Sequence, residues 1–260
     1  MFILPQSILL GMTFPAMCGT FARQSPENAG SSIALLYFTN SFGAFAGVLI
    51  SGFFLIRIVG LPGTLLAAAL INIALALIAW LISKNISMAT HHAAEQPLTN
   101  SNSSPAYQYR FFLFAAFATG TASFIYEIAW IRMLNLVIGA SSHSFELMLS
   151  AFIFGLAFGS LWVHRKIDAS HNLVKILMIV QIAMGMCALL TLPVYGQMFS
   201  LMKLLFAKLP RTDTGYIFFN LSSYGIATAV MLPATFCAGM TLPLITSHLL
   251  KTGHREGAIG

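Results

Sequence analysis

The stretch PATFCAGMTLP, residues 233–243, decides how this sequence is interpreted, because PQSILLGMTFP at residues 5–15 repeats its frame. Both copies follow the pattern P-x5-G-M-T-x-P, and a leucine stands directly before the first proline of each. We interpret this shared frame as an internal repeat. The alternative is that two proline-kinked helices have acquired similar sequences independently. The positions that define the repeat are Pro5, Gly11, Pro15, Pro233, Gly239 and Pro243.

The amino-acid composition indicates that the chain is a membrane protein. The 260-residue chain is 58% hydrophobic and 8% charged, whereas soluble proteins carry about 25% charged residues. Its mean hydropathy is +0.83. A bilayer core about 30 Å thick needs helices of ~20 apolar residues, and lipid requires the backbone to satisfy its own hydrogen bonds. The predicted fold class is therefore an all-α, polytopic transmembrane helix bundle.

Seven apolar stretches are long enough to be predicted as membrane spans. The last of them is too long for one straight crossing, and its two prolines each remove a helix hydrogen bond, so a kinked helix is expected there. The predicted spans are residues 1–21, 33–56, 63–82, 111–138, 144–163, 173–195 and, within 216–250, the seventh.

The third and fourth spans are separated by a segment of different character. Residues 84–109 include EQPLTNSNSSPAYQ, which is rich in Ser, Asn and Pro and has no periodicity. This pattern is typical of a flexible linker. It divides the chain into a first membrane part, residues 1–83 with three spans, and a second, residues 110–260 with four.

The distribution of Lys and Arg predicts the orientation. Basic residues gather beside the linker and in the loop that contains Arg165 and Lys166, whereas residues 139–143 have none. By the positive-inside rule the linker is cytoplasmic. The basic segment LMKLLFAKL, residues 201–209, falls on the outer side, and its pattern is typical of an interfacial amphipathic segment. The net charge of +6 thus reflects topology and anionic lipid, and no nucleic-acid partner is expected.

One acidic side chain is predicted deep in the membrane. Glu127 lies near the middle of the fourth span, in FIYEIAWIRMLN, and Arg132 follows five residues later. A charge at the bilayer centre costs at least ~2.5–3.5 kcal/mol, so it normally faces a cavity or a partner. Five residues correspond to about 140° of helix rotation, and the two side chains share a face poorly. Two roles stay open for Glu127: a substrate cavity, or a structural ion pair with Arg132 or a group on another helix.

The remaining motifs predict packing. Glycines four residues apart lie on one helix face and allow a neighbouring backbone to approach closely. The sequence has no phosphate-binding loop, nucleophile elbow or zinc spacing, so no catalytic residue, cofactor or metal is expected within this chain. The three cysteines are interpreted as small apolar residues without a disulfide. The glycine pairs are Gly43 with Gly47 and Gly155 with Gly159.

The motif Y-E-x-x-W-x-R matches Tyr126, Glu127, Trp130 and Arg132, and the motif P-x5-G-x-T-x-P matches both copies of the repeat. In these motifs the sequence resembles the membrane region of the spermidine synthase-like membrane proteins. Residues 36–66 resemble the segment that follows the P-x5-G-x-T-x-P motif in this family. The resemblance implies a major-facilitator-like unit of two similar six-helix halves. This chain would begin in the fourth helix of the first half and end after the fourth of the second.

The resemblance also carries a functional expectation. Proteins of this family combine the permease-like unit with an aminopropyltransferase, whose soluble catalytic domain is not among these 260 residues. The chain is then expected to anchor that enzyme in the bacterial inner membrane and to move a polyamine-like or other small solute. Tyr126, Glu127, Trp130 and Arg132 would line its cavity. Two alternatives remain: a fragment of a plain major-facilitator-type transporter, or a structural anchor without transport.

Overall fold

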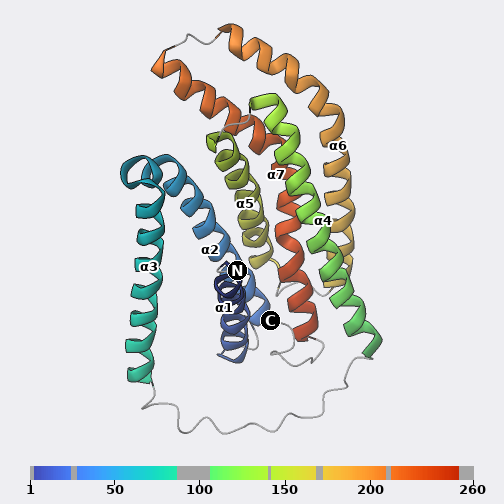
Figure 1. Cartoon of the computed structure of the whole chain (residues 1–260). Coiled ribbons are helices and arrows are strands. Elements are labelled where there is room, and N and C mark those ends of the chain that lie inside the picture. The colour runs from blue at the N-terminus through green and yellow to red at the C-terminus, as the bar shows by residue number, and fades with distance from the viewer. Residues whose placement is uncertain are drawn as a thin grey trace. The chain divides into compact units, whose positions relative to one another are not determined.

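The structure is a computed structural model, which describes residues 3–24, 28–86, 106–139, 142–167, 172–208 and 212–251. These residues form seven α-helices and one π-helical turn, and none of them lies in a β-strand, so the all-α prediction is confirmed (Figure 1). The elements are α1 (Ile3–Gln24), α2 (Ala29–Ile50), η2 (Ser51–Leu55), α3 (Ile56–Ile86), α4 (Ala106–Ile138), α5 (Ser142–His164), α6 (Leu173–Lys208) and α7 (Asp213–Lys251).

Five helical segments are long and apolar enough to cross a membrane, which identifies an integral membrane protein surrounded by lipid. In α1 the apolar part is shorter and covers Ser7–Thr20. The five segments are Ala29–Lys84, Arg110–Val137, His143–His164, Leu173–Leu205 and Ile217–Leu250.

The first of these segments contains a sharp break. Its 56 residues run through α2, η2 and α3, and the helix is interrupted at Gly60, where φ is 68° and ψ is −179°. A left-handed φ of this kind favours glycine. A Cβ added at Gly63 would lie 2.6 Å from the Cβ of Val59, so this position also requires glycine. The break lies between the predicted spans 33–56 and 63–82.

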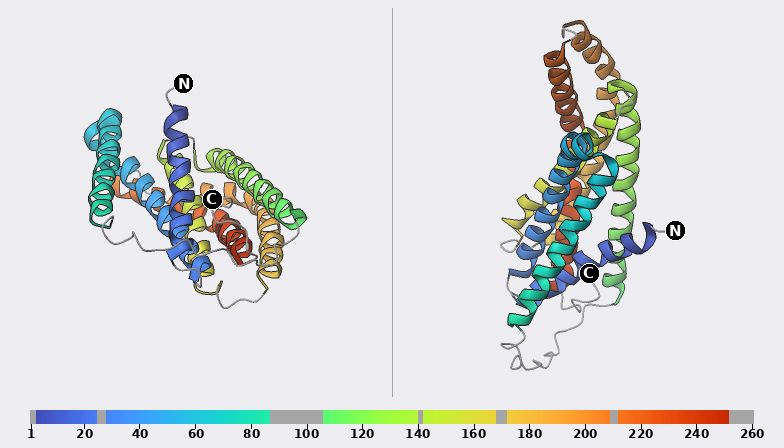
Figure 2. Two further views of the ribbon diagram at one scale, coloured as in Figure 1. Left: turned by 90° about the horizontal axis from the view of Figure 1, so that it is seen from below. Right: turned by 60° about the vertical axis from the view of Figure 1, so that its left-hand side comes forward.

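The chain packs as two compact units. One consists of Leu49–Ser101, in which η2 packs against α3. The other consists of Met1–Val48 and Asn102–Gly260. In this larger unit α7 is the central helix, because it packs against α5, α6 and α4 (Figures 1 and 2). Of the predicted linker, residues 84–86 belong to α3 and residues 106–109 to α4, while 87–105 lie outside the described residues.

The predicted interfacial segment, residues 201–209, is helical as far as the structure describes it. Residues 201–208 are the last turns of α6 and do not form a separate segment. The reason is a buried methionine pair: Met198 and Met202 stand four residues apart, and each is 4% exposed. They continue the inward face of α6 past the predicted end of the span, and Lys203 lies between them and the helix end.

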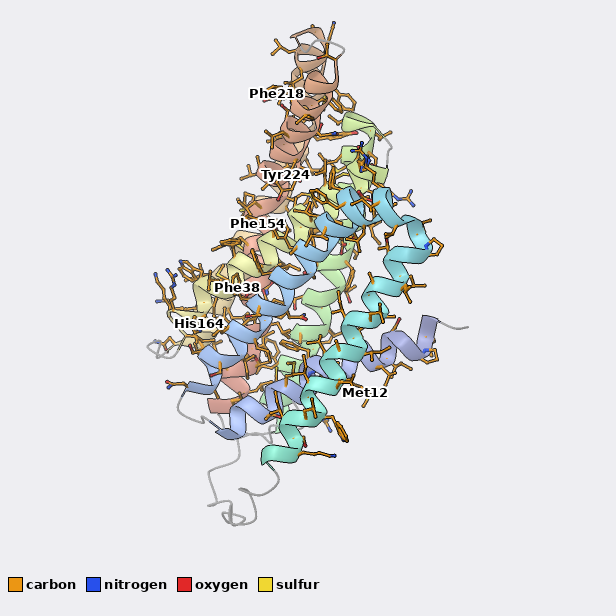
Figure 3. The ribbon with its side chains drawn as sticks, turned by 90° about the vertical axis from the view of Figure 1, so that its left-hand side faces the viewer. Met12, Phe38, Phe154, His164, Phe218 and Tyr224 are labelled. Atoms are coloured by element: carbon orange, nitrogen blue, oxygen red, sulfur yellow. The ribbon has the colours of Figure 1, made fainter. Side chains whose placement is uncertain are left out.

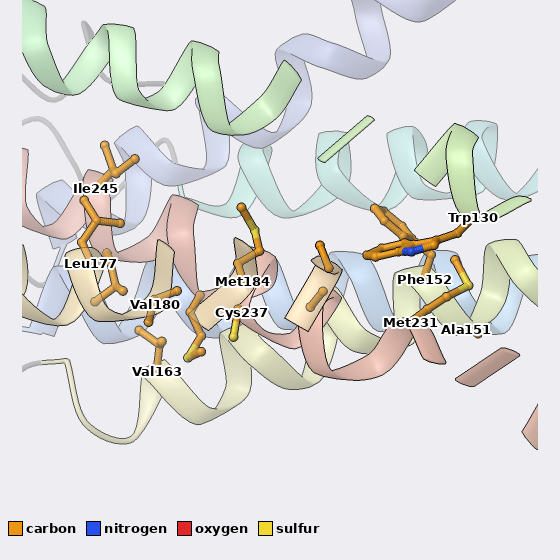
Figure 4. Packing of buried hydrophobic residues seen from close by; sticks show 14 of the residues in the cluster. Trp130, Ala151, Phe152, Val163, Leu177, Val180, Met184, Met231, Cys237 and Ile245 are labelled. Atoms are coloured by element: carbon orange, nitrogen blue, oxygen red, sulfur yellow. The ribbon is translucent and has the colours of Figure 1, made fainter. Parts of the chain in front are cut away.

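The core of the larger unit is built from side chains of five helices, with α2 contributing Ala34. Trp130 of α4, Phe152 of α5, Met184 of α6 and Met231 of α7 all belong to one buried cluster (Figure 4). Lipid is as apolar as these side chains, so helix association in a membrane depends on van der Waals packing and interhelical hydrogen bonds. Close packing of the helices therefore stabilises this bundle.

Candidate functional site

Glu127 lies on α4 at the edge of the face that the helix buries. Trp130, Leu134 and Val137 form that face, and Glu127 is turned about 60° away from Trp130 around the helix axis. Its side chain is half-buried. Among the described residues Glu127 has no ion pair and no hydrogen bond from another side chain. This carboxylate lies ten residues before the end of the Arg110–Val137 segment and meets no ion-pair partner among the residues that the structure describes.

Arg132 lies on another side of the same helix. It is exposed, and it forms no ion pair with Glu127 among the described residues. The helical spacing explains this, since five residues turn the side chain by about 140°. His143 and Glu146 pair with each other at the start of α5, with 3.1 Å between Nδ1 and Oε2.

Tyr126 and Trp130 form an aromatic pair beside Glu127. Their ring centroids are 5.4 Å apart and the planes are inclined by 23°, which is a stacked arrangement. Trp130 is 3% exposed, and its Nε1 donates a hydrogen bond of 3.1 Å to the Thr191 hydroxyl of α6. Trp130 is therefore held in the core between α4 and α6, and Tyr126 is the half-buried, more accessible ring of the pair.

The second copy of the repeat lies at the closest helix contact of the bundle. Gly155 and Gly159 of α5 face α7, where a Cβ on Gly155 would overlap the Thr235 hydroxyl and a Cβ on Gly159 would overlap the Phe236 carbonyl oxygen. A Cβ on Gly239 would in turn overlap the Leu156 carbonyl oxygen. The backbones of α5 and α7 thus touch directly, as small residues in membrane helices permit.

The other predicted glycines have a different environment. A Cβ added at Gly43, Gly47 or Gly11 would meet no atom within 4 Å. Pro5 and Pro233 are both exposed, Pro15 is half-buried, and Pro243 is fully buried. The first copy of the repeat is therefore not packed as the second copy is.

A seam between α2 and α5 is a feature that sequence reasoning missed. Phe38 contacts Phe158 with centroids 6.1 Å apart, and Phe45 contacts Phe154 at 5.2 Å. The contacting residue has a higher number on α2 where its partner has a lower number on α5, so the two helices are antiparallel. Phe38, Phe154 and His164 mark the course of the seam (Figure 3). The phenylalanines at helical spacing in both segments are the signal that could have indicated it.

Hydroxyl groups supply the remaining polar links. The Gln181 side chain of α6 donates to the Thr241 hydroxyl of α7 at 3.1 Å, and Thr241 donates to the carbonyl of Cys237 at 3.2 Å. Among the described residues no group of three His, Cys, Asp or Glu side chains is arranged to hold a metal. Three buried side-chain oxygens have no hydrogen-bond partner in the described part of the chain: those of Asn135, Ser223 and Ser247.

Comparison of the chain with protein-family models, with curated proteins and with solved structures gives no match.

Proposed function

We propose that this chain is the membrane unit of a spermidine synthase-like protein in the bacterial inner membrane. In this account it has seven spans in a major-facilitator-like arrangement, with the linker on the cytoplasmic side. It anchors an aminopropyltransferase and moves a polyamine-like or other small solute across the bilayer. Glu127 provides the negative charge that attracts the solute.

The repeat and the α2–α5 seam support the proposed arrangement of two halves. The two P-x5-G-M-T-x-P copies stand in α1 and α7, one in each membrane part of the chain. The seam joins α2 of the first part to α5 of the second through phenylalanine contacts. An interface between halves that rests on apolar rings, and not on interlocked backbones, is suited to relative movement of the halves.

The observation that carries the proposed solute is the unpaired state of Glu127. An acidic group within a span is costly unless it meets an opposite charge or water. Arg132 points elsewhere, and the described residues offer no other ion-pair partner. A cationic amine would supply the missing positive charge, and the half-buried Tyr126 ring beside Glu127 would add a cation–π contact.

A structural anchor without transport is the second candidate, and one observation favours it. Trp130 is buried, stacked on Tyr126 and hydrogen-bonded to Thr191. This packing links α4 to α6 within one helical turn of Glu127. In the anchor account the half-buried carboxyl is neutral and has no ligand.

Uptake of labelled spermidine into liposomes that contain the purified chain separates the two candidates. We expect Glu127→Gln to abolish uptake, because the amide carries no charge, while the chain keeps its circular dichroism spectrum and melting temperature. Glu146→Gln is the matched control, since it removes a carboxyl at the start of α5. Equal uptake by wild type and Glu127→Gln from about pH 5 to about pH 8 would exclude the cavity role.

The connection to an enzyme has its own test. An aminopropyltransferase domain encoded directly after this sequence, or one that co-purifies with the chain from membranes, supports the anchor for that enzyme. If neighbouring sequence encodes a further set of membrane spans without such a domain, the plain transporter account replaces it.

A further inference from the structure

The amide oxygen of Asn135 in α4 is buried without a donor. No hydrogen-bond partner meets its Oδ1 in the described part of the chain. The hydroxyls of Ser223 and Ser247 can turn to a carbonyl of their own helix, whereas Oδ1 can only accept. Because this chain already encloses the oxygen, a further helix does not reach it. The missing donor therefore belongs to a small group, a water or a ligand.

Asn135 shares one edge of α4 with Glu127. Glu127, Ile131 and Asn135 stand four residues apart, and residues at this spacing lie on one side of a helix. All three side chains are half-buried, and Ile131 packs against the core cluster. The eight residues from Glu127 to Asn135 rise about 12 Å along the helix axis and turn by about 80°. This edge thus presents an acceptor, an apolar side chain and a second acceptor.

Such an edge is complementary to a linear molecule with a donor at each end and methylene groups between them. Glu127 meets the ammonium end, as its charge requires. Ile131 meets the methylene groups, and Oδ1 of Asn135 meets the donor at the far end. An extended chain advances about 1.2 Å per bond, since three backbone bonds span up to about 3.6 Å, so about 12 Å corresponds to nine or ten bonds.

The charge around Asn135 favours an uncharged donor at the far end. The amide oxygen has no formal charge, and the exposed Arg132 stands three residues earlier on α4. Residues three apart are neighbours on a helix surface, so a second ammonium at Asn135 would be repelled by Arg132. A hydroxyl or an amide N–H does not meet this repulsion. Polyamines remain ligands of the site through Glu127.

We propose that Glu127, Ile131 and Asn135 recognise a linear amine that carries an uncharged hydrogen-bond donor about nine bonds from its nitrogen. This inference rests on the proposed role of Glu127 and adds selection by length. Asn135 is the residue that determines this specificity, because a shorter amine reaches Glu127 but not Oδ1.

Two amino alcohols of different length test the proposal by titration calorimetry on the full chain in lipid nanodiscs. The long probe, 8-amino-1-octanol, has the proposed separation between nitrogen and oxygen, and the short probe, 4-amino-1-butanol, is about half as long. Asn135→Leu should weaken binding of the long probe about tenfold and leave binding of the short probe unchanged. Glu127→Gln should abolish binding of both. Asn135→Ala, which also removes the acceptor, should reproduce the pattern and replaces Asn135→Leu if that variant lowers the melting temperature.

Two further variants separate recognition from packing. Asn135→Asp keeps an oxygen acceptor of the same size and should retain the long probe. Asn72→Leu changes an exposed asparagine of α3 and should affect neither probe. The proposal is overturned if Asn135→Leu weakens both probes equally or neither, or if Asn135→Asp loses the long probe as Asn135→Leu does. In those cases loss of both probes in Glu127→Gln still supports the proposed function, whereas unchanged binding to Glu127→Gln contradicts the proposed function itself.

Discussion

The Ser31 hydroxyl of α2 lies 2.7 Å from Nδ1 of His164, at the end of α5. The same Nδ1 is 2.9 Å from the carbonyl oxygen of Ser31. A carbonyl can only accept, so the contact with the Ser31 carbonyl is a hydrogen bond in the tautomer that has its proton on Nδ1. The Ser31 hydroxyl donates in turn to the His164 carbonyl at 3.2 Å. This cluster closes one end of the α2–α5 seam, with the phenylalanine contacts along the rest of it.

His164→Ala removes the donor of this cluster and should lower the free energy of unfolding by about 1 kcal/mol. His164→Asn places an amide N–H near the position of Nδ1 and should recover part of the loss. Thermal unfolding of the purified variants in detergent measures both effects. An equal loss in the two variants would mean that the hydrogen bond from Nδ1 does not contribute.

Two glycine substitutions with the same chemistry should have opposite outcomes. Gly159→Leu forces a side chain into the Phe236 carbonyl and should destabilise the bundle by at least about 1–3 kcal/mol. A Cβ added at Gly47 would meet no atom within 4 Å, so Gly47→Leu should change the melting temperature little. If both variants melt alike, the direct backbone contact of α5 with α7 is wrong.

The hydrogen bond from Trp130 to Thr191 should be detectable as a coupling between α4 and α6. Trp130→Phe and Thr191→Val each remove one partner, and each is expected to cost about 0.5–1.5 kcal/mol of stability. The double variant should cost less than the sum of the single ones, because the second change has no bond left to break. Strict additivity in a double-mutant cycle contradicts the contact.

The orientation inferred from Lys and Arg has a direct test. Single cysteines at Asn102 in the linker and Ser170 in the basic loop should stay unlabelled when intact cells are treated with an impermeant thiol reagent. Ser141→Cys, in the loop without basic residues, should be labelled. Labelling at Asn102 or Ser170 in sealed cells reverses the proposed topology.

The helices could be predicted from the sequence because lipid exposure demands long apolar runs, whatever their partners. The separation of Glu127 from Arg132 was also predictable, since it depends only on the rotation per residue. The position at which α6 ends could not be predicted from the sequence. Lys203 and Lys208 suggested an interface, whereas burial of Met198 and Met202 depends on neighbouring helices that local sequence does not reveal.

The contacts between helices show the same limit. Gly43 with Gly47 and Gly155 with Gly159 have the same local pattern, yet only the second pair touches another backbone. The partner of Trp130 stands 61 positions away, at Thr191. Such pairs are decided by the packing of the whole bundle, so a single sequence read along its length could identify the residues but not their neighbours.

The central claim is that Glu127 binds a cationic amine, and equilibrium binding of labelled spermidine to the purified chain in lipid nanodiscs tests it most directly. We expect saturable binding to the wild type that weakens as pH falls, because a protonated carboxyl no longer attracts the amine. Glu127→Gln should lose this binding, and Glu146→Gln should keep it. Equal, pH-independent binding to all three proteins, or binding to none, would contradict the account.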